Sequence, residues 1–240
     1  MYASSDPGGA QPVTNFIAYK AADMSKLPEF SIESGFHTFP IHTGAEFKVE
    51  GISSITHDVV DIVFKSVAGH PFTYSGQKPT SQMYKPTGGT LGSIEVDTDG
   101  SIAYKFTGFS IPVLAVNETF GHHSVAAVLN LLLARNDKIT GSPFNDVLTG
   151  ADGNATMTGG GGNDKFVFAP GFGKDVIADF AAGDMIAISH KIFANFEAVQ
   201  DSAHVDAHHH VVIMANANET ITLDTVRHVS DLTASEFLIT

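Results

Sequence analysis

The sequence of 240 residues predicts a mainly β protein, all-β apart from one helix. Three observations lead to this fold class. Before residue 117, short runs rich in Val, Ile, Phe and Tyr are separated by Gly, Pro, Asp and Ser, which is typical of strands and turns. One amphipathic helical pattern follows, and after it the chain repeats every nine residues.

The composition excludes several classes of function. The chain has 26 acidic and 13 basic residues, a formal net charge of −13, so we expect no nucleic acid partner. It has no cysteine, which rules out disulfides, thiol nucleophiles and thiolate metal sites. The longest apolar run, at 125–134, is about half of the roughly 20 residues of a membrane span, so no transmembrane segment is expected. Residues 1–9 lack the features of an N-terminal signal peptide.

The first half of the chain predicts an arm followed by a β domain. Residues 1–30 are rich in Pro, Gly and Ser and contain one short apolar patch at 16–19, so we expect a flexible or loosely docked arm. Residues 31–117 are expected to form an antiparallel β domain. An Asp-Gly pair at 99–100 predicts a hairpin turn within it, because these residues tolerate positive φ angles.

Residues 118–135 predict a helix that bridges the two halves. Val125, Val128, Leu129 and Leu132 follow the i, i+3, i+4, i+7 spacing of one helical face. Ser124 is placed to cap its start.

The nine-residue period is the most informative pattern of the sequence. Gly opens successive units at 141, 150 and 159, and Asn recurs at the fifth position. The residue after the Asn is Asp in three of four places, the exception being Ala155, and an apolar residue follows two positions later. The Asn and apolar members of the series are Asn136, Asn145, Asn154 and Asn163, and Ile139, Leu148, Met157 and Phe166.

These units resemble the calcium-binding nonapeptide Gly-Gly-x-Gly-x-Asp-x-U-x, with U apolar, of RTX (hemolysin-type) secreted proteins. The resemblance implies a right-handed parallel β-roll over residues 136–185, in which two repeats make one coil. Gly-rich turns adopt backbone angles that side chains forbid, and they present carbonyl and carboxylate oxygens, the donors that Ca²⁺ prefers. A Ca²⁺ ion would lie between repeat n and repeat n+2.

The resemblance also implies which residues hold the ion. The pair Asp146 and Asp164, two repeats apart, should form the best site, whereas Asp137 would face Ala155 in a weakened or absent site. We therefore expect one strong calcium and one or two weak ones. The candidate metal ligands are Asp137, Gly141, Asn145, Asp146, Gly150, Asp152, Gly159, Gly160, Gly162, Asp164, Asp175 and Asp179.

Two positions leave alternatives open, and one departs from the repeat. Asp175 and Asp179 could add a peripheral calcium or act as turn and cap residues. Phe144 stands where the repeat has its third glycine.

The resemblance continues to the end of the chain, over about residues 136–240. Residues 186–240 are expected to form a β cap that contains a secretion signal, because the C-terminus is similar to those of type I-secreted RTX proteins. This implies a type I exporter as partner and an extracellular or cell-surface location. Seven Asp against three Lys between 136 and 184 would repel one another without cations, so the metal-free roll should be partly unfolded.

Other groups of residues in the sequence give weaker indications of a functional site. His204 and the run 208–210 could bind a transition metal or form a solvated turn. No H-E-x-x-H, G-x-S-x-G or P-loop motif is present. Paired carboxylates for glycan chemistry could come from Glu46, Glu50, Asp58, Asp61, Glu95 and Asp97.

The function predicted from these observations is a secreted calcium-binding protein that acts as an extracellular or surface binding or adhesion protein, with extracellular polysaccharide as a possible ligand. This reading is non-enzymatic. The alternative is a small polysaccharide-modifying enzyme, of the epimerase or lyase type, or its accessory module, in which the roll serves folding and secretion. A pore-forming toxin is disfavoured because the sequence has no long apolar segment.

Overall fold

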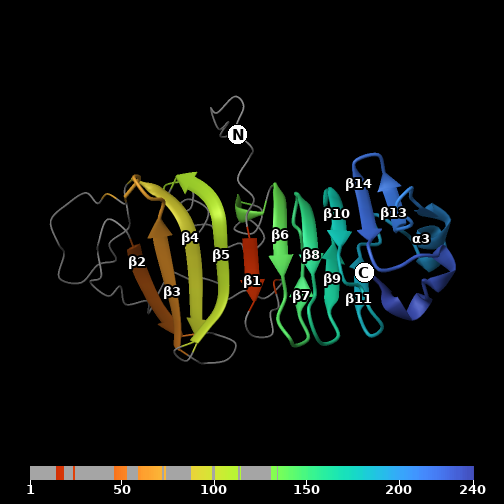
Figure 1. Cartoon of the computed structure of the whole chain (residues 1–240), viewed down its shortest axis with the longest axis horizontal. Coiled ribbons are helices and arrows are strands. Elements are labelled where there is room, and N and C mark those ends of the chain that lie inside the picture. Colours follow the sequence, from red (N-terminus) through yellow and green to blue (C-terminus); the bar gives the residue numbers. More distant parts are fainter. Residues whose placement is uncertain are drawn as a thin grey trace.

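The protein is described by a computed structural model and is mainly β, with its strands side by side along the longest axis (Figure 1). The described residues are 15–18, 24, 46–52, 59–71, 73, 88–98, 101–112, 114, 131–133 and 135–240. With the labels of Figure 1, the strands are β1 (Asn15–Ala18), β2 (Glu46–Ile52), β3 (Val59–Ser66), β4 (Thr90–Thr98), β5 (Ser101–Pro112), β6 (Asn136–Thr140), β7 (Val147–Leu148), β8 (Asn154–Thr158), β9 (Lys165–Phe168), β10 (Lys174–Ile177), β11 (Met185–Ile188), β12 (Ala203–Val205), β13 (Val211–Asn216), β14 (Glu219–Leu223) and β15 (Phe237–Ile239). The helix α3 spans Phe196–Ser202, and 3-10 turns lie at Val229–Asp231 and Ala234–Glu236.

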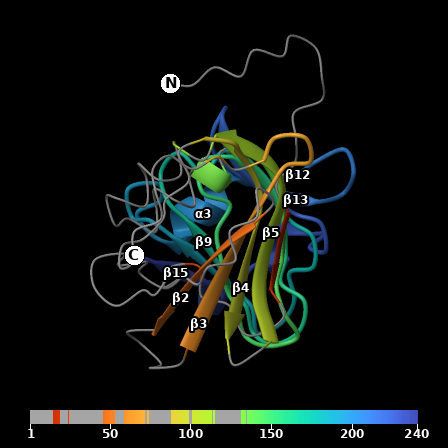
Figure 2. The ribbon, with the colours of Figure 1, turned by 90° about the vertical axis from the view of Figure 1, so that its left-hand side faces the viewer.

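The described strands form two sheets. One has eleven strands in the order β12-β13-β14-β10-β8-β6-β1-β5-β4-β3-β2, and the other has four in the order β15-β11-β9-β7. Seen along the long axis, β4 and β5 lie on one side of the molecule and β9 and β15 on the other (Figure 2). The apolar side chains between the sheets make one continuous core.

The antiparallel part of the large sheet is built from β2, β3, β4 and β5, each paired with the next along the chain. Its strands are rich in β-branched and aromatic residues, which fit a pleated, half-buried surface. Alternate residues face the core, among them Phe64, Ile94 and Phe106, each at most 5% exposed. This is the antiparallel arrangement predicted for the described part of residues 31–117.

Strand β1 joins the antiparallel strands to the repeat region. It pairs antiparallel with β5 and parallel with β6, so it lies between two segments that are far apart in the sequence. Phe16 is fully buried, and its ring lies 4.9 Å from that of Phe106. Within the expected flexible or loosely docked arm of residues 1–30, residues 15–18 are docked as a strand, because the apolar patch there completes the core between β5 and β6.

Consecutive strands of the repeat region alternate between the two sheets. β6, β8 and β10 pair in parallel within the large sheet, and β7, β9 and β11 pair in parallel within the small one. This alternation is the arrangement expected of a parallel β-roll, and the right-handed sense of its coil stays a prediction. The apolar position of each unit points inward and is fully buried, as Ile139, Leu148, Met157, Phe166, Ile177 and Ile186 show.

The C-terminal strands extend both sheets of the roll. β14 pairs in parallel with β10, β13 and β12 follow as an antiparallel hairpin, and β15 pairs in parallel with β11. The helix α3 begins at the cap Asn195, whose side chain accepts the N–H of Ala198, and it buries Val199. No helix within the described ranges is long and apolar enough to cross a membrane.

The bridging helix predicted over 118–135 is described only at its end. Leu131 and Leu132 have helical backbone, and the predicted cap at Ser124 lies outside the described residues. Helix α3, by contrast, was not among the predicted elements.

We expect Phe16→Ala to lower the free energy of unfolding by about 3–5 kcal/mol, because it leaves a cavity where β1, β5 and β6 meet. Ile17→Ala is the matched control, since Ile17 is on the opposite face of the same strand and is partly exposed. Chemical denaturation in the presence of calcium measures both. Equal effects of the two substitutions would show that β1 is not packed as described.

Candidate metal centre

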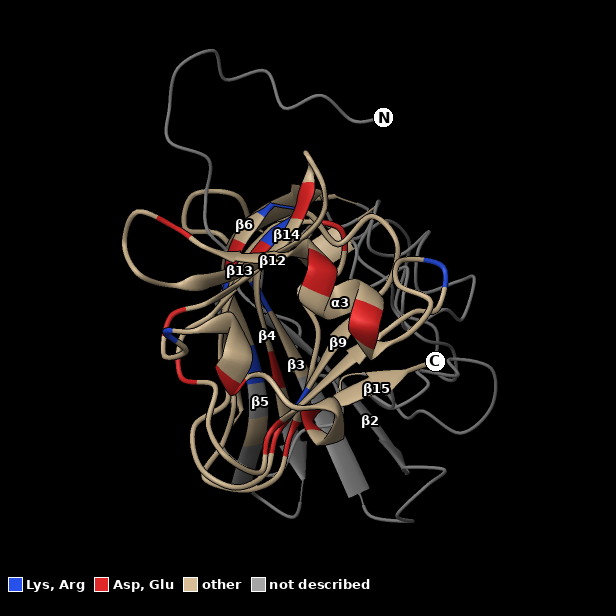
Figure 3. Ribbon diagram, turned by 90° about the vertical axis from the view of Figure 1, so that its right-hand side faces the viewer, with Lys and Arg blue, Asp and Glu red and all other residues tan. Residues whose placement is uncertain are grey.

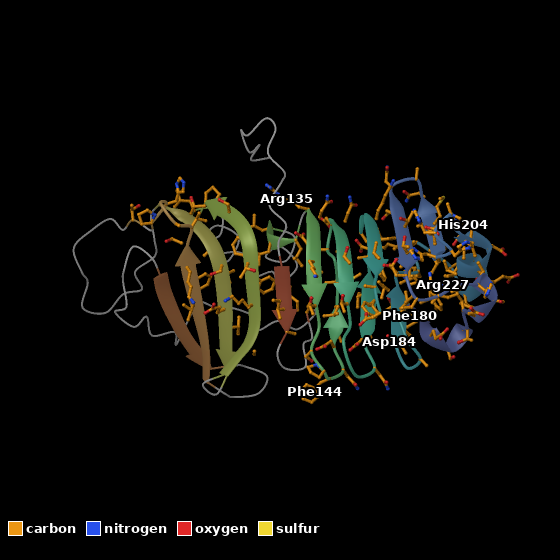
Figure 4. The ribbon with its side chains drawn as sticks, viewed as in Figure 1. Arg135, Phe144, Phe180, Asp184, His204 and Arg227 are labelled. Carbon is orange, nitrogen blue, oxygen red and sulfur yellow. The ribbon has the colours of Figure 1, made fainter. Side chains whose placement is uncertain are left out.

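Three buried Asp residues line one edge of the roll. Asp146, Asp164 and Asp184 directly precede β7, β9 and β11, and each is at most 7% exposed. The N–H of Asp146 donates to Oδ1 of Asp164, and the N–H of Asp164 donates to Oδ1 of Asp184, both at 2.9 Å. The carboxylates of Asp164 and Asp184 are thus held against the main chain of the preceding coil. Neighbouring turns carry acidic segments at the lower edge in Figure 3, and Figure 4 shows Asp184 there.

The glycine that opens each unit leaves space for the carboxylate of the same turn. A Cβ on Gly141 would lie 2.6 Å from Oδ2 of Asp146, and a Cβ on Gly159 would overlap Oδ2 of Asp164. The N–H of Ser142 donates to Oδ2 of Asp146 at 2.6 Å, so the turn closes around this oxygen. The candidate residues Gly141 and Gly159 are therefore required by the position of the carboxylates.

The opposite edge carries a second series, made of Asp137, Ala155 and Asp175. Asp137 is opposite Ala155 in the register of β6 and β8, as the sequence analysis expects. The N–H of Ala155 donates to Oδ1 of Asp175 at 2.7 Å, and a Cβ on Gly150 would lie 2.9 Å from Oδ2 of Asp175. Asp175 therefore places a carboxylate in the 150–155 turn, where Ala155 has none.

The repeated Asn residues connect each coil to the following one by hydrogen bonds. Oδ1 of Asn145 accepts the N–H of Asn163, and Oδ1 of Asn154 accepts the N–H of Lys174, both at 2.8 Å. The Asn side chain thus accepts a hydrogen bond from the following coil, whereas the carboxylate of an Asp such as Asp164 accepts one from the preceding coil. This reciprocal bonding explains why Asn and Asp recur as a pair, and it uses the side chain of Asn145 as an acceptor for the main chain.

The remaining candidates differ in their surroundings. Oδ1 and Oδ2 of Asp179 accept the N–H groups of Gly159 and Gly160, both at 2.8 Å, so Asp179 caps this turn, and its role as a calcium ligand stays a prediction. Asp152 is exposed, unlike the Asp residues of the two series. Gly160 and Gly162 have φ angles of +96° and +107°, which shape the 159–164 turn. Phe144 is 58% exposed and points away from the roll (Figure 4), so its turn accommodates the departure from glycine.

Asp184 belongs to this series although it was not among the candidate ligands expected from the sequence. It follows Asp164 by 20 positions, whereas Asp164 follows Asp146 by 18, so it falls out of the nine-residue period. The signal that could have found it is the tripeptide Asp-x-apolar. This pattern occurs at 146–148, at 164–166 and again at 184–186.

Burial makes the charge of these carboxylates costly. It raises the pKa of Asp164 to about 6, against a hydrogen bond from the Asp146 N–H that lowers it, and the charges of Asp184, Asp146 and Asp179 raise it further. Burial likewise raises the pKa of Asp175 to about 8. Oδ2 of Asp175 is buried and has no hydrogen-bond partner among the described residues. A bound cation would compensate these charges and give this oxygen a partner.

The donor set fits a hard cation. The buried side-chain donors are carboxylate oxygens, and the turns around them offer main-chain carbonyls. Among the described residues, no group of three His, Cys, Asp or Glu side chains could hold a metal ion. A bound ion would therefore take main-chain carbonyls as its further ligands, and such carbonyl-rich, adaptable sites suit Ca²⁺ better than Mg²⁺.

The His run lies in the turn between β12 and β13. Oδ1 of Asp206 accepts the N–H groups of His208 and His210, at 2.9 and 2.8 Å, and His209 has a positive φ of 64°. These bonds form an Asx-type turn, which is one of the two alternatives predicted for the run.

The comparison with protein families identifies the repeats. The model of the RTX calcium-binding nonapeptide repeat (4 copies) matches residues 133–166. This segment contains Asp146 and Asp164 and ends before Asp175 and Asp184. The comparison with curated proteins finds no match. Residues 133–166 are therefore RTX calcium-binding repeats, whereas the resemblance beyond residue 166 stays a prediction.

We expect the metal-free protein to lose stability as the pH rises from about 4 to 8. An unfolded Asp titrates near 4, so between this value and the folded pKa values of about 6 and about 8 the folded state binds more protons than the unfolded state. Each such group can contribute at most about 1.4 kcal/mol per pH unit. The fraction of β-sheet signal that remains in chelator, followed by far-UV circular dichroism from pH 5 to 8, measures this slope.

Asp175→Asn is the control for this pH dependence, because it removes the group with the higher pKa and should flatten the slope between pH 6 and 8. A metal-free stability that rises over this range, or a slope unchanged by the substitution, would contradict the assignment of buried carboxylates.

Proposed function

We propose that this chain is a secreted calcium-binding protein whose right-handed roll folds on calcium outside the cell and acts there as a binding or adhesion protein. The observation that carries the proposal is the pair of buried Asp series, which begins within the RTX calcium-binding repeats at Asp137, Asp146 and Asp164. The location is supported by the resemblance of the C-terminal part to type I-secreted proteins.

The proposed ions lie between turns that are one coil apart. The 141–146 and 159–164 turns would share one ion through Asp146 and Asp164, and the next turn would share another through Asp164 and Asp184. On the opposite edge, Asp175 would serve the 150–155 turn and take the place of the missing carboxylate at Ala155. The weakened site expected there would thus be partly restored.

Calcium would also act as the signal for folding. Buried carboxylates repel one another and resist ionisation without a cation, so a chain in a low-calcium compartment would stay unfolded and suited to export. Outside, ions that bind only the folded state stabilise it by RT ln(1 + [L]/Kd), about 2.7 kcal/mol for each site at a hundredfold excess over Kd.

Titration calorimetry on the chelator-treated full chain tests the proposal. We expect Ca²⁺ to bind with a Kd on the order of 10⁻⁴–10⁻³ M or tighter, and Mg²⁺ at least tenfold more weakly. Asp146→Asn should weaken the binding, because it removes one carboxylate of the first site. A titration without calcium binding would refute the proposal.

The alternative enzyme function is favoured by one observation. The register places Glu50, Asp61 and Asp97 opposite one another on β2, β3 and β4, and Asp58 lies outside the described residues. Paired carboxylates are the usual catalytic groups of glycan-cleaving enzymes. A screen of polyuronate substrates for cleavage or epimerisation, with Asp61→Asn as the inactive variant, separates the two functions.

A further inference from the structure

The outer face of the large sheet is the side opposite the core. Phe106, Phe16 and Ile139 are register partners on β5, β1 and β6, and all three are buried. Residues one position away point outward, because side chains alternate along a strand. Lys105 and Lys138 are among these outward residues.

Lysines occur on every second strand of this face. Lys65 lies on β3, Lys105 on β5, Lys138 on β6 and Lys174 on β10, with β4, β1 and β8 between them. Strands in a sheet are about 4.8 Å apart, so neighbouring lysines are separated by about 10 Å across the sheet. We call these four residues the lysine row.

The lysine row follows a line of register partners, that is, residues paired with one another on neighbouring strands across the sheet. Lys65 and Lys138 are members of this line, and Lys105 and Lys174 lie two residues away from it along their strands. The members of this line are Lys65, Ser93, Thr107, Asn15, Lys138, Thr156 and Val176.

The chain as a whole has a net charge of −13, and the positive charge of the lysine row comes from Lys138 and Lys174. Glu95 is almost buried and pairs with Lys65 and Lys105 at 2.6 and 2.7 Å, and the register places Glu46 opposite Lys65, so the charges of Lys65 and Lys105 are largely compensated. Lys138 and Lys174 are exposed. Around them, the outward residues of β6, β8, β10 and β14 include no acidic side chain and are Asn136, Thr140, Asn154, Thr156, Thr158, Val176, Thr220 and Thr222.

We propose that the lysine row binds a linear acidic polysaccharide that lies across the strands; the proposal rests on the extracellular binding role given above. The ammonium groups would pair with carboxylates that recur along the polymer. The Thr hydroxyls and Asn amides between them offer hydrogen bonds to sugar hydroxyls. Several weak contacts along one polymer add up to useful affinity, so no deep pocket is required.

Nucleic acid fits this surface poorly. Duplex DNA has one charge per about 1.7 Å of its axis, much denser than a lysine every 10 Å or so, and the net negative charge of the chain repels it. An acidic polysaccharide carries fewer charges and more hydroxyls, which matches the sparse lysines and the Thr-rich face.

The test is binding of the calcium-loaded full chain to sodium alginate by affinity electrophoresis, with neutral dextran and duplex DNA as comparison polymers. We expect alginate to bind, with an affinity that falls as salt rises, and dextran and DNA to bind at least tenfold more weakly. Lys138→Gln with Lys174→Gln should weaken alginate binding about tenfold or more. Thr156→Lys, which adds a charge between them, should strengthen it several-fold.

The matched control is Lys165→Gln with Lys191→Gln, which removes the same charge outside the large sheet. Equal losses in the two double variants, no effect of Thr156→Lys, or tighter binding of DNA than of alginate would overturn the proposal. Calcium titrations of the wild type and the variants separate the two proposals. If the wild type binds calcium but not alginate, the polysaccharide site on the lysine row is refuted alone. If the wild type binds no calcium, the proposed function is refuted.

Discussion

A chelator should abolish most of the β-sheet signal of the roll, and millimolar calcium should restore it. At pH 7.5 the two Asp series place several carboxylates in buried positions, and at least two of them have raised pKa values. An uncompensated buried charge costs several kcal/mol, which is comparable with the whole stability of a domain. The metal-free roll therefore cannot remain folded with all of these groups ionised.

Far-UV circular dichroism and hydrogen exchange of the full chain measure this effect. Exchange should rise throughout β6–β11, with their amides protected only when calcium is present. Magnesium at the same concentration is the control and should restore much less structure. Protection of β6–β11 that does not depend on calcium would rule out a calcium-dependent fold.

Asp164→Asn should have opposite effects on the two forms of the protein. Asp164 stands between Asp146 and Asp184 in its series, so it would contribute to two ions. We expect a roughly hundredfold loss of calcium affinity, about 3 kcal/mol. In chelator at pH 8 the same change removes a buried charge while keeping a side-chain oxygen for the Asp146 N–H, so more of the β-sheet signal should remain without calcium than in the wild type.

Calcium titrations and far-UV circular dichroism in chelator measure the two parts of this prediction. Asp201→Asn is the matched control, because it removes the same charge from an exposed position on α3, outside the repeat turns, and should change calcium affinity little. If Asp164→Asn lowered the β-sheet signal in chelator as much as it does with calcium, Asp164 would have a structural role and no role as a ligand.

The repeats could be predicted because the residues that determine the structure of each unit lie within that unit. Each unit contains its own inward apolar residue and its own turn glycine, so the period of nine places Leu148, Met157 and Phe166 in the core. The same locality predicted the pairing of Asp146 with Asp164. Between Asp164 and Asp184 the spacing is 20 residues instead of 18, so the nine-residue period no longer predicts the position of the Asp. Asp184 was missed for this reason.

Elements that depend on distant partners could not be predicted in the same way. The four residues of β1 have no strong pattern of their own, and they become a strand because β5 and β6 offer hydrogen bonds on both sides. The carboxylate that Asp175 places in the 150–155 turn likewise comes from the next coil, where no residue of the turn itself predicts it. The lysine row becomes visible only through the strand order, which brings Lys65 and Lys174 onto one face.

The position of β1 also has a consequence for the order of folding. Coils of the roll join partners 18–20 residues apart, whereas β1 pairs with residues of β6 that lie 138 − 15 = 123 positions later. Closing such a long loop costs more entropy, and distant pairings form slowly. The roll should therefore assemble before β1 arrives, and until then the free edge of β6 is a template on which a strand from another copy can add.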